Sequence, residues 1–256
     1  MTSALEWPSL YDGRLVVIEE TSSTNEEALR AISEGAVSGT WILARSQTSG
    51  RGRSGRSWVS PPGNLYASLI LNDVAPLSHA YQLALVCGVA IHDAVIKATG
   101  TREPRRLELK WPNDLLLDRS KVGGILVESS VAGNADRADV VVGIGLNLRS
   151  APKIEGVRTS RLADFGLVID PEKMVGFLDY ALQHWLSMWM AEDGFHQVRR
   201  AWLARSVPLG TGLTVTAPDG PFQGSFAGLS SEGYLLLADA RGHTTRHAFG
   251  DVSVGV

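Results

Sequence analysis

Apolar residues along this chain recur with two different periods, and each period predicts a different kind of element. Short apolar runs bounded by turn residues predict strands at residues 14–20, 39–45, 64–71, 107–117, 121–130 and 138–148. Longer segments, whose apolar residues recur every three or four positions, predict helices at residues 24–34, 77–99, 170–189 and 195–204. Strands and helices therefore share the larger part of the chain.

Two of the predicted helices have recognisable starts. Asp170 followed by Pro171 is typical of an N-cap and a first helical residue. Thr24, with Glu27 three residues later, predicts a capping box, so residues 23–25 could serve only to start the helix. A helix N-terminus also presents free backbone N–H groups to a polar ligand, and the sequence leaves both uses open.

The periodicity changes after Val207. Five short strand candidates, most of them separated by turn-forming residues, follow at residues 213–217, 221–229, 234–239, 243–249 and 251–254. This close spacing is typical of a small antiparallel barrel. We therefore predict a boundary near Ser206, with a larger domain at residues 1–206 and a small β-barrel domain at residues 207–256.

Composition narrows the class of protein. The chain has 256 residues, of which 44% are hydrophobic, so it can bury a full core. A formal net charge of -3 and a pI near 6.1 give no overall positive field for non-specific nucleic-acid binding. Cys87 is the single cysteine and lies in an apolar run, which favours a core role in a reducing compartment.

The N-terminal residues do not have the pattern of a signal peptide, and no uncharged apolar run is long enough to span a bilayer. We therefore expect a soluble cytoplasmic protein with no membrane partner.

Residues 50–58 read GRGRSGRSW and join two predicted strands. Glycine lets the backbone turn and brings its N–H groups close to a ligand, and the arginine fork matches carboxylate and phosphate oxygens. Little in this stretch can pack, so ordering it costs entropy. The stretch therefore predicts a flexible loop that closes over an anionic substrate.

Two later strands have polar residues where a plain core would be apolar. The segment KWPND contains Lys110, Asn113 and Asp114, and the segment KVGG runs from Lys121 to Gly124. Adjacent glycines in a strand mark a close approach of a ligand or another backbone, although KWPND alone could be a bulge and a lone lysine is usually solvated. Arginine, lysine and Mg²⁺ held by an aspartate would offset the repulsion between two reacting anions, such as a carboxylate and an α-phosphate.

Five motifs occur in order along the chain, namely GRGRSGRSW, SPPGNLYAS, KWPNDLLL, KVGGILVE and VVGIGLNL, together with an upstream STN and Gln47. This series closely resembles the biotin protein ligases over most of residues 17–148. The resemblance implies an α/β (α+β) fold, in which helices pack on the mixed sheet of a catalytic domain and a small SH3-like β-barrel follows.

The resemblance also implies a two-step, ATP-dependent enzyme. Biotin and ATP give biotinyl-5′-AMP and pyrophosphate, and a lysine of a biotin carboxyl carrier protein then takes the biotinyl group. The usual acceptor belongs to acetyl-CoA carboxylase or a related carboxylase.

Matched positions imply roles for individual residues. Arg53 and Lys121 would be catalytic because they offset the charges of the reacting groups. The implied biotin-binding residues are Ser23, Thr24, Asn25, Gln47, Arg51, Gly52, Arg53, Tyr66, Lys121 and Gly124. The implied ATP or adenylate contacts are Trp58, Lys110, Asn113, Asp114 and Asn147, with Asp114 as the candidate ligand of Mg²⁺.

Two other classes of protein compete with this interpretation. A lipoate ligase uses the same adenylation logic but usually lacks the combination of KWPND and GRGRxGR. A module that grips a nucleic acid or another polyanion through its arginines is disfavoured by the acidic pI.

The sequence also bears on three possible partners, namely operator DNA, the carboxylase that is modified and a second copy of the chain. The bifunctional biotin ligases have a DNA-binding domain before the catalytic strands, and here the first such strand begins near Arg14, so we expect no operator binding. The sequence leaves open which carboxylase is modified and whether the chain forms a homodimer.

Overall fold

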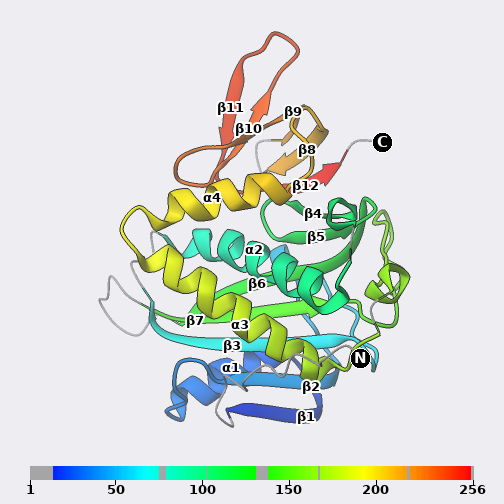
Figure 1. Ribbon diagram of the computed structural model, residues 1–256, viewed down its shortest axis with the longest axis vertical. Coiled ribbons are helices and arrows are strands. Elements are labelled where there is room, and N and C mark those ends of the chain that lie inside the picture. The colour runs from blue at the N-terminus through cyan, green and yellow to red at the C-terminus, as the bar shows by residue number, and fades with distance from the viewer. Residues whose placement is uncertain are drawn as a thin grey trace.

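The computed structural model describes residues 14–74, 79–101, 103–130, 138–166, 168–217 and 220–254 (Figure 1). A seven-stranded mixed sheet has the strand order β1-β2-β3-β7-β6-β5-β4. Its strands are β1 (Leu15–Thr21), β2 (Trp41–Gln47), β3 (Leu65–Val74), β4 (Leu107–Lys110), β5 (Asp114–Leu117), β6 (Ser120–Ser130) and β7 (Ala138–Leu146). β1 and β2 pair in parallel, and the other neighbouring strands of this sheet pair antiparallel.

Helices cover both faces of this sheet. One layer consists of α2 (Ala80–Thr99), α3 (Pro171–Met190) and α4 (Gly194–Arg205), and α1 (Thr24–Ser33) lies on the other face (Figure 1). Alternate strand residues serve the two faces, since Leu43 and Leu69 join the large core beneath α2 to α4, whereas Ile42 and Ile70 pack with α1. The mixed α/β prediction is confirmed.

The predicted capping box at Thr24 is wrong. The N-cap position is Ser23, which makes no side-chain cap bond. The backbone N–H of Thr24 and its Oγ1 instead donate to Gln47 Oε1, at 2.9 and 3.2 Å. Glu27 accepts a hydrogen bond from Thr21 Oγ1 at 2.8 Å. A side chain of β2 thus satisfies the helix start, and the polar residues there serve tertiary contacts.

The prediction of one strand at residues 107–117 is also wrong, because the chain turns back at Trp111 and Pro112. The bond between these two residues is cis, and Lys110 pairs with Asp114 across the β4–β5 ladder. Pro112 has no N–H to donate to a ladder, so it falls at the turn. This turn brings the polar residues of KWPND to one end of the sheet.

β5 and β6 form the hairpin that the sequence predicts. Asp118 and Arg119 make its two-residue turn with φ of 47° and 62°, the left-handed values that a type I′ turn requires.

The C-terminal strands form a second, antiparallel sheet. They are β8 (Gly212–Ala217), β9 (Gly220–Leu229), β10 (Leu235–Ala238), β11 (Thr244–His247) and β12 (Asp251–Val254), in the order β11-β10-β9-β8-β12. The five predicted strands are confirmed, and β11 and β12 are the two edges of this ladder. At the predicted boundary the N–H of Val207 donates to Leu109 O at 3.0 Å. The division into domains at residues 1–206 and 207–256 stays a prediction.

Helix α2 is the most apolar element of the helical layer. By length and composition its segment Tyr81–Thr99 could cross a membrane, but 67% of that window is buried inside the protein. Cys87 lies in it and is fully buried, and burial raises the pKa of this thiol to about 12. Both observations are those expected of a core helix.

Asp93 joins the three helices of this layer. Its carboxylate accepts hydrogen bonds from Arg205 Nε at 2.7 Å and from Trp185 Nε1 at 3.1 Å, and His92 Nδ1 lies 3.4 Å away. Burial raises the pKa of Asp93, but these hydrogen bonds and the charge of Arg205 outweigh it, so the pKa is lower than usual. Ionised Asp93 therefore stabilises the fold above its unfolded pKa, and this stabilisation is lost as pH falls through the folded pKa.

Replacing Asp93 with asparagine should lower the free energy of unfolding at pH 7 by about 1–3 kcal/mol, because the partly buried guanidinium of Arg205 loses its anion. The difference from wild type should shrink below pH ~4, where the unfolded carboxyl becomes protonated. Urea unfolding at pH 7 and at lower pH measures both effects. Asp118→Asn is the control, since Asp118 pairs with Arg106 at the surface and should matter little. Equal stability of Asp93→Asn and wild type at pH 7 would contradict this account.

Candidate active site

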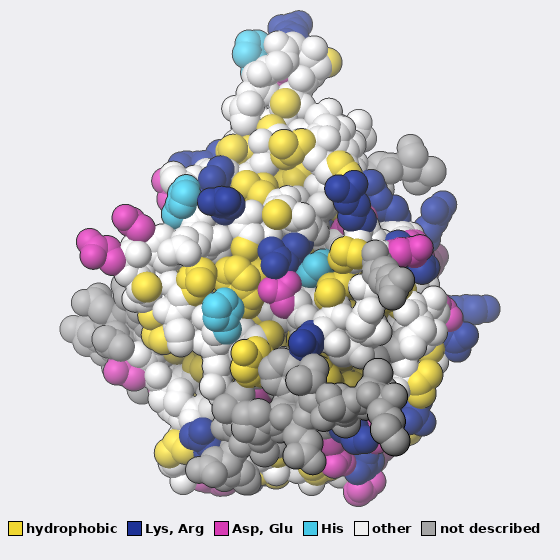
Figure 2. Space-filling model, in the orientation of Figure 1, with side chains coloured by type: hydrophobic (Ala, Val, Ile, Leu, Met, Phe, Trp, Pro, Cys, Tyr) yellow, Lys and Arg dark blue, Asp and Glu magenta, His cyan; other side chains and the backbone are white. Residues whose placement is uncertain are grey.

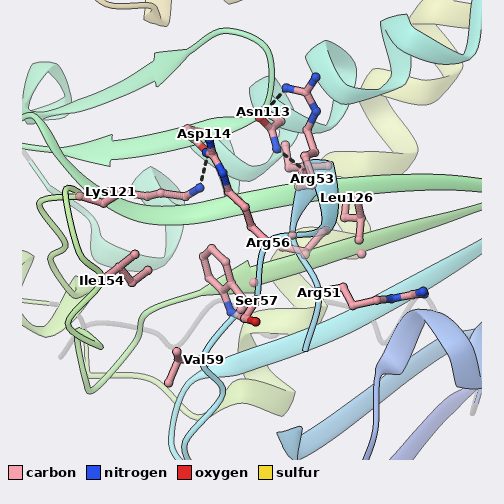
Figure 3. A pocket seen from close by; sticks show the side chains of 18 of the residues that line it. Arg51, Arg53, Arg56, Ser57, Val59, Asn113, Asp114, Lys121, Leu126 and Ile154 are labelled. Atoms are coloured by element: carbon pink, nitrogen blue, oxygen red, sulfur yellow. Dashed lines mark hydrogen bonds and ion pairs between the residues drawn. The ribbon is translucent and has the colours of Figure 1, made fainter. Parts of the chain in front are cut away.

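A cavity of about 410 Å³ opens beneath residues 50–58, here called the arginine loop, at the face of β6 and β7 (Figure 3). Of the residues to which the motifs assign roles, all but Asn147 line this cavity. The amide of Asn147 is buried and donates to Ser160 O at 3.0 Å, so it holds the chain that follows β7. The fold thus brings the motifs together, while the role of each residue stays a prediction.

Polar side chains at the start of α1 form one wall of the cavity. Gln47 Oε1 accepts from Thr24, and Ser68 Oγ lies 2.6 Å from Asn25 Oδ1. Thr24 and Asn25 are each at least 96% buried. Their hydrogen bonds fix the side chains in the folded protein, so this wall can present donors and acceptors to an uncharged polar ring in a set geometry.

Two glycines of β7 lie where other side chains come very close to the floor of the cavity. A Cβ on Gly143 would overlap Asn25 Oδ1, and a Cβ on Gly145 would lie 2.5 Å from the indole of Trp58. Lys121 Nζ lies 5.4 Å from the centroid of a Trp58 ring. Only glycine at these two positions lets the start of α1 and the end of the arginine loop approach the sheet this closely.

Gly143→Ala is therefore expected to displace Asn25 and to weaken by about 10-fold the biotin binding that the sequence resemblance implies, with a loss of about 1–3 kcal/mol in stability from overpacking. Isothermal titration with biotin and thermal unfolding measure the two effects. Gly212→Ala is the matched control, because a Cβ on this other strand glycine meets nothing within 4 Å. Wild-type biotin affinity in Gly143→Ala would show that the position of Asn25 is unimportant.

Asp114 lies between two lysines at the cavity wall. Lys121 Nζ is 2.6 Å from its Oδ1, and Lys110 Nζ is 2.7 Å from its Oδ2. Burial raises the pKa of Asp114, but the charges of Lys121 and Lys110 outweigh burial, and the pKa lies below its usual value. The carboxylate is therefore ionised, and the cluster keeps one net positive charge for an anionic ligand.

Arg53 lies at the tip of the arginine loop, in the short 3₁₀ turn η1 (Arg53–Gly55). The next residues, Ser54 and Gly55, have φ of 54° and 72°, so the chain turns sharply there. Arg53 Nη1 lies 3.4 Å from Asn113 Oδ1 (Figure 3). Burial lowers the pKa of Arg53, although Asp251 and Asp114 raise it, and a guanidinium remains charged at neutral pH. A second cation thus lies close to the lysine pair.

The other two arginines of the loop bind acidic side chains. Arg51, expected to face the ligand, lies at the rim with its Nη2 3.1 Å from Glu128 Oε2 and its Nη1 3.6 Å from Glu26 Oε1. Arg56 Nη2 donates to Asp251 Oδ2 of β12 at 2.8 Å. The arginine loop is therefore bonded to β6 and to the C-terminal sheet.

The sequence that carries this arrangement matches a known protein family. The model of the biotin/lipoate A/B protein ligase family matches residues 17–147, just over half of the chain. The chain belongs to this family. The match covers every motif of the cavity and leaves out the helices α3 and α4 and the C-terminal sheet.

Individual relatives of this chain match it along most of its length. It is 38% identical to a biotin–[acetyl-CoA-carboxylase] ligase of Paracoccus denitrificans over 88% of this chain and 95% of that protein. It is 31% identical to the bifunctional ligase/repressor BirA of Bacillus subtilis over 89% of this chain and 70% of that protein. The biotin protein ligase of Aquifex aeolicus, solved with biotin and ATP, has a TM-score of 0.77 at 28% identity, covering 94% of this chain and 98% of that one.

Several residues that line the cavity or bond to its lining were not singled out from the sequence. Lys153, Ile154, Val157 and Asp251 line it. Ser60, Ser68 and Glu128 form hydrogen bonds with the lining residues Gln47, Asn25 and Arg51, respectively. Glu128 ends the motif KVGGILVE, so its motif was visible. Nothing in the local pattern around Asp251 indicates its contact.

Proposed function

We propose that this chain is an ATP-dependent biotin protein ligase, which makes biotinyl-5′-AMP and transfers biotin to a lysine of a carrier protein. The observation that carries the proposal is the single cavity where the start of α1, the arginine loop and Lys121 meet. Fixed uncharged polar groups at the start of α1, the cations Lys121 and Arg53, and apolar side chains such as Leu126 all line this cavity. Together they fit a ligand with a polar ring, an apolar chain and an anionic end.

In the first step, a carboxylate oxygen of biotin attacks the α-phosphorus of ATP, and the bond from that phosphorus to pyrophosphate breaks. Both reactants are anions, so cations of the protein must offset their repulsion. Lys121 can turn from Asp114 to a ligand oxygen, because Lys110 remains 2.7 Å from the other carboxylate oxygen. Arg53 approaches from the arginine loop and supplies the second positive charge.

In the second step, the neutral amine of the carrier lysine attacks the acyl carbon of biotinyl-5′-AMP and loses a proton. AMP leaves with the electrons of the broken bond. Water would hydrolyse the same acyl adenylate, so the site must exclude solvent between the steps. The arginine loop covers the cavity and can do this.

Magnesium fits this site as an ion that arrives with the nucleotide. Among the described residues there is no group of three or more His, Cys, Asp or Glu side chains placed to hold a metal. Mg²⁺ commonly keeps several waters and binds one or two carboxylates together with substrate phosphates. Asp114 would be the protein ligand once a lysine releases one of its oxygens, and the ion would neutralise phosphate charge.

A lipoate ligase is the second candidate, because the matched family includes both kinds of enzyme. The names of the relatives reported above favour biotin. A nucleic-acid-binding module is disfavoured by the formal net charge of -3, and the face drawn in Figure 2 carries both acidic and basic side chains. The Paracoccus relative suggests that the acceptor is the carrier protein of acetyl-CoA carboxylase, and we expect a cytoplasmic enzyme.

Exchange of labelled pyrophosphate into ATP tests the first step. The rate should depend on biotin, and lipoate at the same concentration should not replace it. Exchange that depends on lipoate instead would favour the second candidate, and no exchange with either acid would contradict adenylation.

A further inference from the structure

Glu128 of β6 has two partners that belong to different parts of the cavity. Its Oε2 accepts a hydrogen bond from Asn25 Nδ2 at 2.7 Å and another from Arg51 Nη2 at 3.1 Å. Asn25 is 3% exposed, whereas the side chain of Glu128 is 28% exposed. One carboxylate oxygen therefore connects the buried start of α1 to the first arginine of the loop.

The remaining bonds connect Asn25 to the other end of the arginine loop. Ser68 Oγ lies 2.6 Å from Asn25 Oδ1 and 2.8 Å from Thr24 Oγ1. Thr24 donates to Gln47 Oε1, and Gln47 Nε2 donates to Ser60 Oγ at 2.9 Å. This chain of bonds from Ser60 to Arg51, here called the circuit, holds the loop at both ends.

Ser60 completes the circuit at the loop itself. Its hydroxyl donates to the backbone oxygen of Trp58 at 2.8 Å, and Arg51 stands at the opposite end of the loop. Glu128 is the link between Arg51 and the rest of the circuit. Without it, the Asn25 amide would keep Leu126 O at 3.3 Å as an acceptor, and Arg51 would keep, among the described residues, the more distant Glu26 as its acidic partner.

We propose that Glu128 is a positioning residue for the ligase reaction, which holds Asn25 in place for biotin and holds the start of the arginine loop over the adenylate. This role rests on the proposed function. The carboxylate acts through two separable bonds, since the amide of Asn25 needs an acceptor and the bond to Arg51 needs a negative charge. A surface ion pair alone would contribute little, but Asn25 is buried and its amide costs free energy when it is left without this acceptor.

Glu128→Gln and Glu128→Ala separate the two bonds. The glutamine keeps an acceptor for Asn25 and loses the charge, so biotin affinity should stay within about 2-fold while biotinyl-5′-AMP is released about 5- to 10-fold faster. The alanine loses both bonds, so biotin affinity should also fall by about 10-fold. Glu26→Gln is the matched control, because Glu26 touches Arg51 at 3.6 Å and its change should leave both quantities near wild type.

Calorimetric titration with biotin and a chase of preformed labelled adenylate give the two readouts, and thermal unfolding checks the fold. If the alanine variant does not fold, adenylate release from Glu128→Gln at the wild-type rate would overturn the proposal. Unchanged affinity and release in a folded Glu128→Ala would overturn it as well, with the proposed function intact. A wild-type protein that binds no biotin would overturn the proposed function, and the role of Glu128 with it.

Discussion

Replacing Lys121 with alanine is expected to slow the formation of biotinyl-5′-AMP by about 100-fold or more. Its ammonium group lies at the cavity wall, 2.6 Å from Asp114 Oδ1, within reach of a reacting carboxylate. A preorganised cation in a site that partly excludes water stabilises developing negative charge far more than a cation in bulk water. Single-turnover adenylate formation from labelled ATP measures the rate.

Two checks separate this effect from a loss of structure. Asp114 keeps Lys110 at 2.7 Å in the variant, so the protein should still unfold cooperatively. Lys153→Ala is the matched control, because Lys153 lines the same cavity without an assigned role, and its loss should change the rate little. Adenylate formation by Lys121→Ala at the wild-type rate would remove this lysine from the reaction.

Replacing Arg53 with alanine is expected to lower the rate of the first step by about 100-fold and to speed the loss of adenylate from the site. Arg53 Nη1 lies 3.4 Å from Asn113 Oδ1. Among the described residues, Arg51 and Arg56 each have an acidic partner at ion-pair distance, whereas Arg53 has none. Its charge and its fork are therefore available to a phosphate. Single-turnover formation and a chase of labelled adenylate measure the two rates.

Arg53→Lys distinguishes charge from geometry. Lysine keeps the positive charge but lacks the planar fork, so it should restore part of the rate of the first step and less of the adenylate retention. Adenylate synthesis and release unchanged in Arg53→Ala would count against a catalytic role for this residue.

Sequence patterns predicted the strands and helices well because each has a periodic local signal. The alternation of Leu43 and Leu69 with Ile42 and Ile70 follows from a sheet covered on both faces. The turn at Pro112 was missed because strand-like segments, LELK and DLLL, flank it on each side, and the pairing of Lys110 with Asp114 depends on the bend.

The site motifs could be listed from the sequence, but the contacts between them could not. Thr24 was interpreted as a helix cap, since a local pattern does not reveal that Gln47 reaches it from β2. Arg56 and Asp251 are 195 positions apart, and their contact depends on how the second sheet packs. The contacts of Glu128 with Asn25 and Arg51 could not be predicted, because they depend on how β6 lies against α1 and the arginine loop. Side-chain partners of this kind are set by tertiary packing, which no local period encodes.

The most direct test of the central claim is transfer of labelled biotin to a carrier protein by the purified full chain in the presence of ATP and Mg²⁺. We predict label on one lysine of the biotin carboxyl carrier protein of acetyl-CoA carboxylase, dependent on ATP and abolished when that lysine is replaced by arginine. A chain that binds biotin and ATP yet leaves the carrier unlabelled would contradict the assignment as a biotin protein ligase.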